Sequence, residues 1–380
     1  MKLTIVCLVA LLRATQASAS PPPGYQCQDF SVDVAVNNVT TIVPPLPIIE
    51  TQEQATSYVN ELVRRDAPTV QPVFTSLSKT FMVSGEWCAP VEKGLKSSTL
   101  QILTHGYGFN RSYWDFRLDP TDAQYSYIDA ATTAGYSVLS YNRLGHAPSS
   151  IPDPYTELQA PVEVDVLVTL TRMVREGAIP GLAIPDKVIH VGHSYGSALT
   201  IGLAEVAPSL SDGLVITGWI QVPDFAGYFL SSTAFTIASD AEPSRFPADT
   251  YSKGYVTWPS EAANQFAFFA YPNFEAAALT EAEATKHPLA LNEFLSQGLI
   301  GAQAPEFEGP VLFLVGERDQ IACGYNCTGL IGPGSPAAMT FNATRSFEWQ
   351  IHPEVGHALN LHKNATAAYD IISEWIGRRT

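Results

Sequence analysis

The stretch KVIHVGHSYGSALTIGLAEV, residues 187–206, decides the fold. Its first six residues are typical of a strand that stops abruptly, and the part after residue 196 predicts a helix to about residue 206. Between them stands GHSYG, a G-x-S-x-G pattern. A serine on such a tight strand-to-helix turn is exposed beside a helix N-terminus, which favours developing negative charge. This context favours a nucleophile at Ser194 over a turn without chemistry.

Strands alternate with helices on both sides of this stretch. The alternation predicts an α/β fold, with a mostly parallel central sheet covered by helices on both faces. Between residues 222 and 306 the pattern changes, because aromatic residues are dense there and no strand is convincing. The other predicted strands are 30–43, 80–87, 100–104, 136–141, 213–219, 311–316 and 347–351, and the other predicted helices are 51–65, 163–176 and 367–378.

A nucleophilic serine needs a base, and a carboxylate must orient that base. In this architecture the chain order is serine, acid, histidine. Asp319 follows the strand that ends at residue 316, and His357 follows the last predicted strand, so both have the expected placement. Asp224, after the preceding strand, is the alternative acid, whereas Glu317 is expected to point aside. The predicted catalytic residues are therefore Ser194, Asp319 and His357.

Other residues near the motif have predicted roles in its surroundings. His352 is expected to be structural, while His193 and His146 flank the site and are expected to line it without transferring protons. The oxyanion requires two backbone N–H donors. One is expected from Tyr195, directly after the serine, and the other from Tyr107, in the HGYG loop of residues 105–108.

The N-terminus has the pattern of a targeting signal. Residues 1–19 combine a basic start, an apolar run of about ten residues and an A-x-A-like site, which is the pattern of a secretory signal peptide. The run is too short for a membrane anchor, which needs about twenty apolar residues. No later segment is long and apolar enough to span a bilayer. We therefore expect a secreted protein without a stable membrane anchor.

Cysteines and sequons agree with secretion. Removal of Cys7 with the signal leaves four cysteines, which suggest two disulfides with three possible pairings. Proximity favours Cys323–Cys327, which leaves Cys27–Cys88. Spacing and missing histidine partners argue against a metal site. Five sequons predict N-glycosylation, at Asn38, Asn110, Asn326, Asn342 and Asn364.

The charge excludes several partners. A formal net charge of −16 repels nucleic acid and disfavours anionic membranes. The composition, with 15% charged and 11% aromatic residues, suits a folded globular protein. We expect a monomer.

With these motifs the chain resembles the α/β-hydrolases, specifically the secreted type found in fungi, over residues 80–378. The resemblance rests on HGYG with FNRSYWD, YNRLG, GHSYG, GERD and the final Gly356-His357. Asn142 departs from the Asp of many relatives, at a position that is not catalytic there. A serine nucleophile argues against the haloalkane dehalogenases and epoxide hydrolases, which use an Asp. The implied domains are a signal peptide (1–19), an N-terminal extension (20–79), a core in two parts (80–221 and 307–380) and a helical cap insertion (222–306).

The resemblance and the aromatic cap imply a function. An aromatic cap indicates an apolar binding cleft. The leading hypothesis is a secreted serine hydrolase that cleaves carboxylic esters, lactones or lipids of small apolar substrates through an acyl-enzyme, without metal or organic cofactor. Amide, peptide or C–C bond hydrolysis, or acyl transfer on a secondary metabolite, is the second hypothesis, because the triad alone does not choose among these reactions. A low-turnover binding protein is the third.

Overall fold

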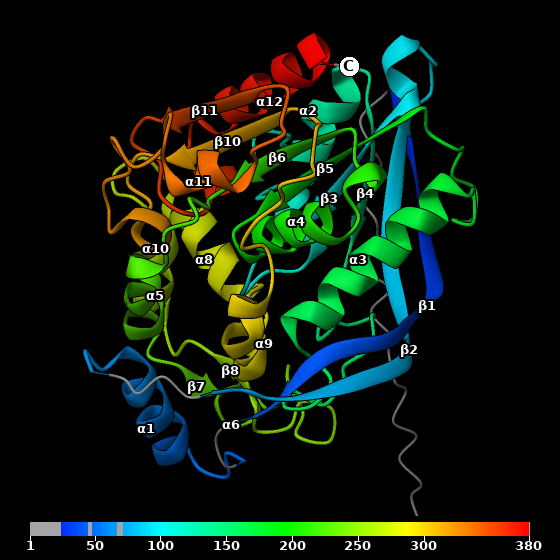
Figure 1. Cartoon of the computed structure of the whole chain (residues 1–380). Coiled ribbons are helices and arrows are strands. Elements are labelled where there is room, and N and C mark those ends of the chain that lie inside the picture. Colours follow the sequence, from blue (N-terminus) through cyan, green and yellow to red (C-terminus); the bar gives the residue numbers. More distant parts are fainter. Residues whose placement is uncertain (1–23, 45–47, 67–70, 380) are drawn as a thin grey trace, which may run out of the picture.

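The computed structural model describes residues 24–44, 48–66 and 71–379. Its main sheet is built from β1 (Tyr25–Val43), β2 (Val73–Pro90), β3 (Thr99–Thr104), β4 (Ser137–Tyr141), β5 (Lys187–His193), β6 (Gly213–Thr217), β10 (Val311–Gly316) and β11 (Phe347–His352). Within the described residues these eight strands lie in the order β1-β2-β4-β3-β5-β6-β10-β11. Neighbours from β4 to β11 run parallel, which confirms the predicted mostly parallel sheet (Figure 1).

Helices cover both faces of this sheet. On one face α2 (Tyr127–Thr133) packs with α12 (Ala365–Arg379), and on the other α3 (Ala160–Arg175) packs with α4 (Tyr195–Val206) (Figure 1). Every residue of β3, β4, β6 and β10 is buried. Burial along whole strands, rather than on alternate residues, is what a sheet covered on both faces requires. The predicted fold class is therefore confirmed.

The segment between β6 and β10, residues 222–306, is called the cap segment below. Its strands pair antiparallel in a small separate sheet, which corrects the expectation that this segment holds no strand. Strands of two or three residues are too short to display the alternation that reveals a strand in sequence. The elements of the cap segment are α5 (Ala226–Thr233), β7 (Thr236–Ile237), α6 (Ala238–Ala241), β8 (Tyr255–Thr257), α7 (Glu261–Phe268), α8 (Ala276–Ala284), β9 (Leu289–Ala290) and α9 (Leu291–Ser296).

The N-terminal region is part of the main sheet, which differs from the expected extension outside the core. β1 pairs along its length with β2, β2 pairs antiparallel with β4, and the expected boundary at residues 79 and 80 falls inside β2. Val34 and Val36 of β1 are buried while their neighbours are exposed. An antiparallel edge strand with one buried face produces this alternation. The motifs that resemble those of the α/β-hydrolases begin at residue 105, after β1 and β2. The motifs alone therefore gave no reason to place β1 in the core.

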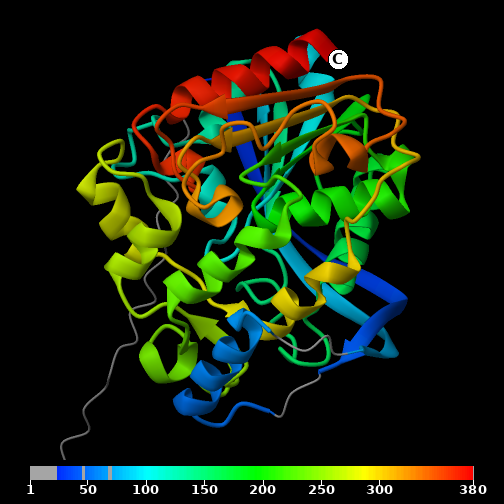
Figure 2. The same ribbon diagram turned by 60° about the vertical axis from the view of Figure 1, so that its left-hand side comes forward.

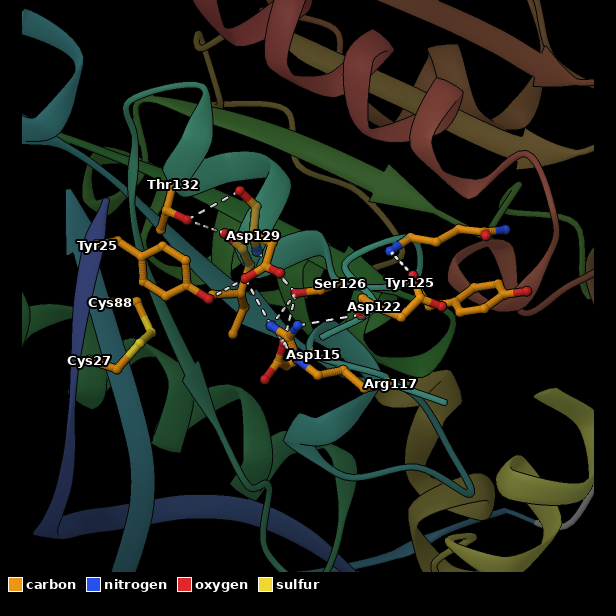
Figure 3. A network of polar contacts seen from close by, with 12 residues as sticks. Tyr25, Cys27, Cys88, Asp115, Arg117, Asp122, Tyr125, Ser126, Asp129 and Thr132 are labelled. Atoms are coloured by element: carbon orange, nitrogen blue, oxygen red, sulfur yellow. Dashed lines mark hydrogen bonds and ion pairs between the residues drawn. A yellow bond between two sulfur atoms is a disulfide. The ribbon is translucent and has the colours of Figure 1, made fainter. Parts of the chain in front are cut away.

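A polar cluster and a disulfide fix the start of β1 (Figure 3). The Tyr25 hydroxyl donates to the buried carboxylate of Asp129 on α2. Arg117 lies 2.7 Å from an Asp115 oxygen and 2.8 Å from an Asp129 oxygen, so it neutralises both carboxylates. Cys27 and Cys88 are directly opposite each other in the register of β1 and β2 and are joined by the predicted disulfide.

Between β1 and β2 the chain crosses to the cap segment. There α1 (Gln52–Val63) begins at Thr51, with a capping box that includes Gln54. α1 packs against α5 and β7 (Figure 2). The Gln52 amide donates to the Phe235 carbonyl and accepts from the Ile237 N–H, at 2.9 Å each. The N-terminal region therefore joins the sheet to the cap segment.

The predicted signal peptide, residues 1–19, lies outside the described residues. In the part of the chain that is described, no helix has the length and apolar character needed to cross a membrane.

Candidate active site

Ser194 stands on the sharp turn between β5 and α4. Its backbone φ of 55° and ψ of −122° lie outside the regions that a serine usually adopts. The turn is closely packed, because a Cβ on Gly192 would come within 2.5 Å of the Gly196 carbonyl oxygen, and one on Gly196 within 2.1 Å of the Thr104 carbonyl oxygen. Glycine at both places is therefore a steric requirement, as expected for a strained turn that presents a nucleophile.

One chain of hydrogen bonds joins the three predicted catalytic side chains. Asp319 Oδ2 lies 2.7 Å from His357 Nδ1, and Ser194 Oγ lies 2.8 Å from His357 Nε2. Because the carboxylate accepts the Nδ1 proton, the other ring nitrogen of a neutral imidazole has its lone pair free for the serine hydroxyl. All three side chains are buried. The arrangement matches a nucleophile, a general base and an orienting acid.

Asp319 is held in place by backbone groups of the loop to which it belongs. Asp319 follows β10 and caps α10 (Gln320–Cys323), because its Oδ1 accepts the Ala322 N–H at 2.7 Å. Just after it, the predicted Cys323–Cys327 disulfide closes the loop. One carboxylate oxygen thus accepts a backbone N–H, while the other accepts the Nδ1 proton of His357.

The alternative acids lie elsewhere. Asp224 is exposed in a short 3₁₀ turn (Pro223–Phe225). The Glu317 carboxylate accepts the Glu354 N–H at 2.9 Å, so it points aside as expected. Neither carboxylate is bonded to His357.

The three other histidines considered from the sequence, His193, His352 and His146, each have a structural partner. The Thr217 hydroxyl donates to the Gly192 carbonyl at 2.8 Å, so it accepts from His193 Nδ1 at 3.1 Å. Burial, with a smaller effect of His357, holds the pKa of His193 well below its usual value and keeps this ring neutral. His352 bonds to the Asn364 carbonyl, and His146 to the Leu144 carbonyl.

The predicted oxyanion loop lies against the nucleophile. A Cβ on Gly106 would approach Ser194 Cβ to 2.8 Å and Ser194 Oγ to 3.3 Å, so only glycine lets this backbone come so close. The rings of Tyr107 and Tyr195, the two predicted backbone donors, stack with centroids 4.1 Å apart. The stack ties the oxyanion loop to the residue after the nucleophile.

Sequence reasoning missed a buried charge cluster beneath this stack. Arg143 donates to Glu163 on α3 at 2.6 Å and to Glu293 on α9 at 2.7 Å, and all three side chains are buried. Burial raises the pKa of Glu163 well above its usual range, in spite of the opposing charge of Arg143, and the nearby Glu293 raises it further. Glu163 and Glu293 thus share one buried cation. The one signal in the sequence was an unexplained Arg143 inside the conspicuous YNRLG segment.

A cavity of about 450 Å³ opens at Ser194. Its wall is mostly apolar, and three phenylalanines come from the cap segment, which are Phe229, Phe268 and Phe294. None of the described residues that line it is charged. Such a cavity suits a neutral apolar group of modest size.

Metal binding has one candidate cluster in the described residues. Cys27, Glu86 and Cys88 place their ligand atoms close together. However, the two sulfur atoms are joined to each other in the disulfide, so they are not thiolate ligands.

Comparisons with known proteins agree with this architecture. The family model described as "Alpha/beta hydrolase family" matches residues 101–369. A thermophilic esterase from Thermogutta terrifontis is similar in structure, with 16% identity, a TM-score of 0.50 and coverage of 79% of this chain and 95% of the esterase. The peroxisomal alpha-beta-hydrolase Lpx1 from Saccharomyces cerevisiae is also similar, with 10% identity, a TM-score of 0.52 and coverage of 94% and 88%. At these identities the similarity concerns the fold. No curated protein matches the sequence.

Proposed function

The chain belongs to the alpha/beta hydrolase family, and from this premise we propose that it is a secreted serine hydrolase that cleaves carboxylic esters of apolar substrates. The observation that carries the proposal is the position of His357, which bonds Ser194 through one ring nitrogen and Asp319 through the other. Secretion is supported by the pattern of residues 1–19 and by cysteine pairing in the folded chain.

In the first half-reaction Ser194 Oγ attacks the ester carbonyl carbon while His357 Nε2 takes the hydroxyl proton. Asp319 stabilises the resulting imidazolium and keeps its orientation. The carbonyl oxygen becomes negatively charged and accepts the N–H groups of Tyr107 and Tyr195. The tetrahedral intermediate then collapses, the C–O bond breaks, and the alcohol leaves with the proton from His357. The product is an acyl-enzyme on Ser194.

In the second half-reaction water replaces the alcohol. His357 takes a proton from the water as it attacks the acyl carbon, and returns it to Ser194 Oγ as the acid leaves. No charged group lines the cavity in the described residues, so the acyl or alcohol group that it holds is neutral and apolar.

Labelling with a fluorophosphonate probe tests the proposal. The probe reacts with activated serines, so we expect it to label the wild type and not Ser194→Ala. Hydrolysis of p-nitrophenyl butanoate should fall at least about a thousandfold in Ser194→Ala and in His357→Ala, because triad members act as a unit. A folded Ser194→Ala variant with activity within tenfold of wild type would overturn the mechanism.

A further inference from the structure

A second cavity, of about 420 Å³, adjoins the one at Ser194. We call it the tail groove. Its wall includes Val164 of α3, Gly202 and Val206 of α4, residues 37–40 of β1 and Phe74 of β2. Ile300 lines both cavities. The tail groove is therefore continuous in its wall with the cavity that holds the reacting ester.

The partition between the two cavities is a short stretch of chain after α9. Gln297 and Gly298 face the cavity at Ser194, Leu299 faces the tail groove, and Ile300 contributes to both. The partition is packed on α4 at its far end, where the Gly301 N–H donates to Glu205 at 2.8 Å, and it is open at Gly298, where an added Cβ would meet no atom within 4 Å. The half-buried Ile300 is the one described lining residue that the two cavities have in common.

The wall of the tail groove is mixed, with exposed apolar side chains beside the polar residues Asn37, Asn38 and Thr40. Phe74 is 58% exposed and Val206 64% exposed, and both lie on its wall with the partly exposed Leu299. Exposed apolar side chains are common singly, but a group around one hollow indicates a binding surface. The charged groups on the wall are Asp165 and Glu205, and none of the described residues that line it is basic.

We propose that the tail groove binds the distal part of a long, uncharged acyl chain whose ester carbonyl lies at Ser194. The acyl chain of the substrate passes Ile300 and lies between α3, α4 and the β1–β2 pair. The carboxylates of Asp165 and Glu205 disfavour a chain that ends in an anionic group. The substrate class is thus a long-chain neutral ester, and this inference rests on the proposed function of Ser194.

Chain-length selectivity tests the groove. We would measure kcat/KM for p-nitrophenyl decanoate and butanoate, below the concentration at which either aggregates, and take the ratio of the two. All variants would carry Thr40→Ala, which removes the Asn38 sequon and keeps a glycan out of the groove. Phe74→Gln and Val206→Gln should each lower the ratio several-fold, and the double variant about tenfold, because the distal methylenes lose apolar contacts. Leu95→Gln is the matched control, since Leu95 is 99% exposed and lines neither cavity, so it should leave the ratio at the value of the Thr40→Ala parent.

Ile300→Trp is a second, independent probe. A larger side chain at the junction should block the passage and lower the ratio about tenfold. Thermal unfolding would establish that the variant is folded, and the surface variants Phe74→Gln and Val206→Gln keep the test valid if it is not. If butanoate is hydrolysed in a Ser194-dependent way but the ratio is unchanged in the groove variants, the tail groove is refuted and the proposed function stands. If no ester of any length is hydrolysed, the proposed function itself fails.

Discussion

The guanidinium carbon of Arg143 lies 4.7 Å from the centre of the Tyr195 ring, directly beneath the residue that follows the nucleophile. The same side chain donates to the Gly106 carbonyl at 3.3 Å, so one buried cation contacts both parts of the predicted oxyanion site. It also reaches Glu293 on α9 of the cap segment. A cation over an aromatic face is attracted to it, and more strongly when both are desolvated. The packing of the cap segment is thereby coupled to the backbone that surrounds Ser194.

The two glutamates that contact Arg143 should be able to replace each other as its counter-charge. Glu163→Gln and Glu293→Gln each leave one carboxyl beside the buried cation and should each cost about 1 kcal/mol of unfolding free energy. The double variant removes both and should cost about 3–5 kcal/mol, because it leaves the cation buried without an opposing charge. Urea unfolding of the three isosteric variants measures the difference. A double variant that loses no more than the sum of the two single losses would contradict this shared role.

The identity of the acid is open to a direct test. Asp319→Asn should lower kcat about 10²–10⁴-fold, because an amide cannot hold the imidazole in the tautomer that accepts the serine proton. Asp224→Asn is the matched control, since its exposed carboxylate is bonded to no part of the site, and kcat should stay within twofold of wild type. A larger loss in Asp224→Asn than in Asp319→Asn would reverse the assignment.

Local patterns predicted the centre of this molecule well. The buried strand β10 is a continuous apolar run, and β3 and β5 are largely apolar, so their type and place could be read from neighbours in sequence. The order of Ser194, Asp319 and His357 follows from the same pattern, because parallel strands bring their carboxyl ends to one edge of a sheet.

Features that depend on distant partners could not be read in this way. Glu163 lies 20 positions from Arg143, and Glu293 lies 150 positions away, so no local pattern joins them. β1 and β2 are separated by α1, and their pairing in the main sheet depends on long-range register. The tail groove has the same origin, because its wall combines β1, β2, α3, α4 and the stretch after α9.

The two disulfides should differ in importance, one mattering more for stability and the other more for activity. Cys27–Cys88 spans 61 positions and Cys323–Cys327 spans 4, so loop-closure entropy predicts losses of about 4 and about 2 kcal/mol when each pair is replaced by serine. Activity should rank the other way, because the Cys323–Cys327 loop includes Tyr325, whose N–H donates to the Asp319 carbonyl at 3.0 Å. We expect kcat several-fold lower in the Cys323→Ser/Cys327→Ser variant and within twofold of wild type in Cys27→Ser/Cys88→Ser. Unfolding curves and butanoate kinetics of both variants would test this, and a lower kcat in the latter would contradict it.

The sequons should differ in occupancy. Asn326 and Asn342 are exposed, so a glycan on either extends into solvent, whereas the exposed Asn38 lies on the wall of the tail groove. Asn110 and Asn364 are half-buried, and the side-chain oxygen of Asn364 also accepts from the Asn273 amide at 2.7 Å. Glycopeptide mass spectrometry of protein from a secretory host should therefore find Asn326 and Asn342 occupied and Asn110 and Asn364 largely bare. High occupancy at Asn110 would show that the loop after HGYG folds after glycan transfer.

Buried neutral histidines should make the protein lose stability in acid. Burial lowers the pKa of His190 to about 3 and that of His362 to about 4, against about 6.5 in an unfolded chain. Below pH 6.5 the unfolded state therefore binds more protons than the folded state, so the stability present at neutral pH is lost progressively as the pH falls toward these lowered values. His190→Gln removes one such group, and the drop in unfolding free energy between pH 7 and pH 4.5 should shrink by about 2–3 kcal/mol relative to wild type. Comparing each protein with itself at the two pH values cancels the constant cost of the substitution, and an unchanged drop would mean that His190 is protonated in the folded protein.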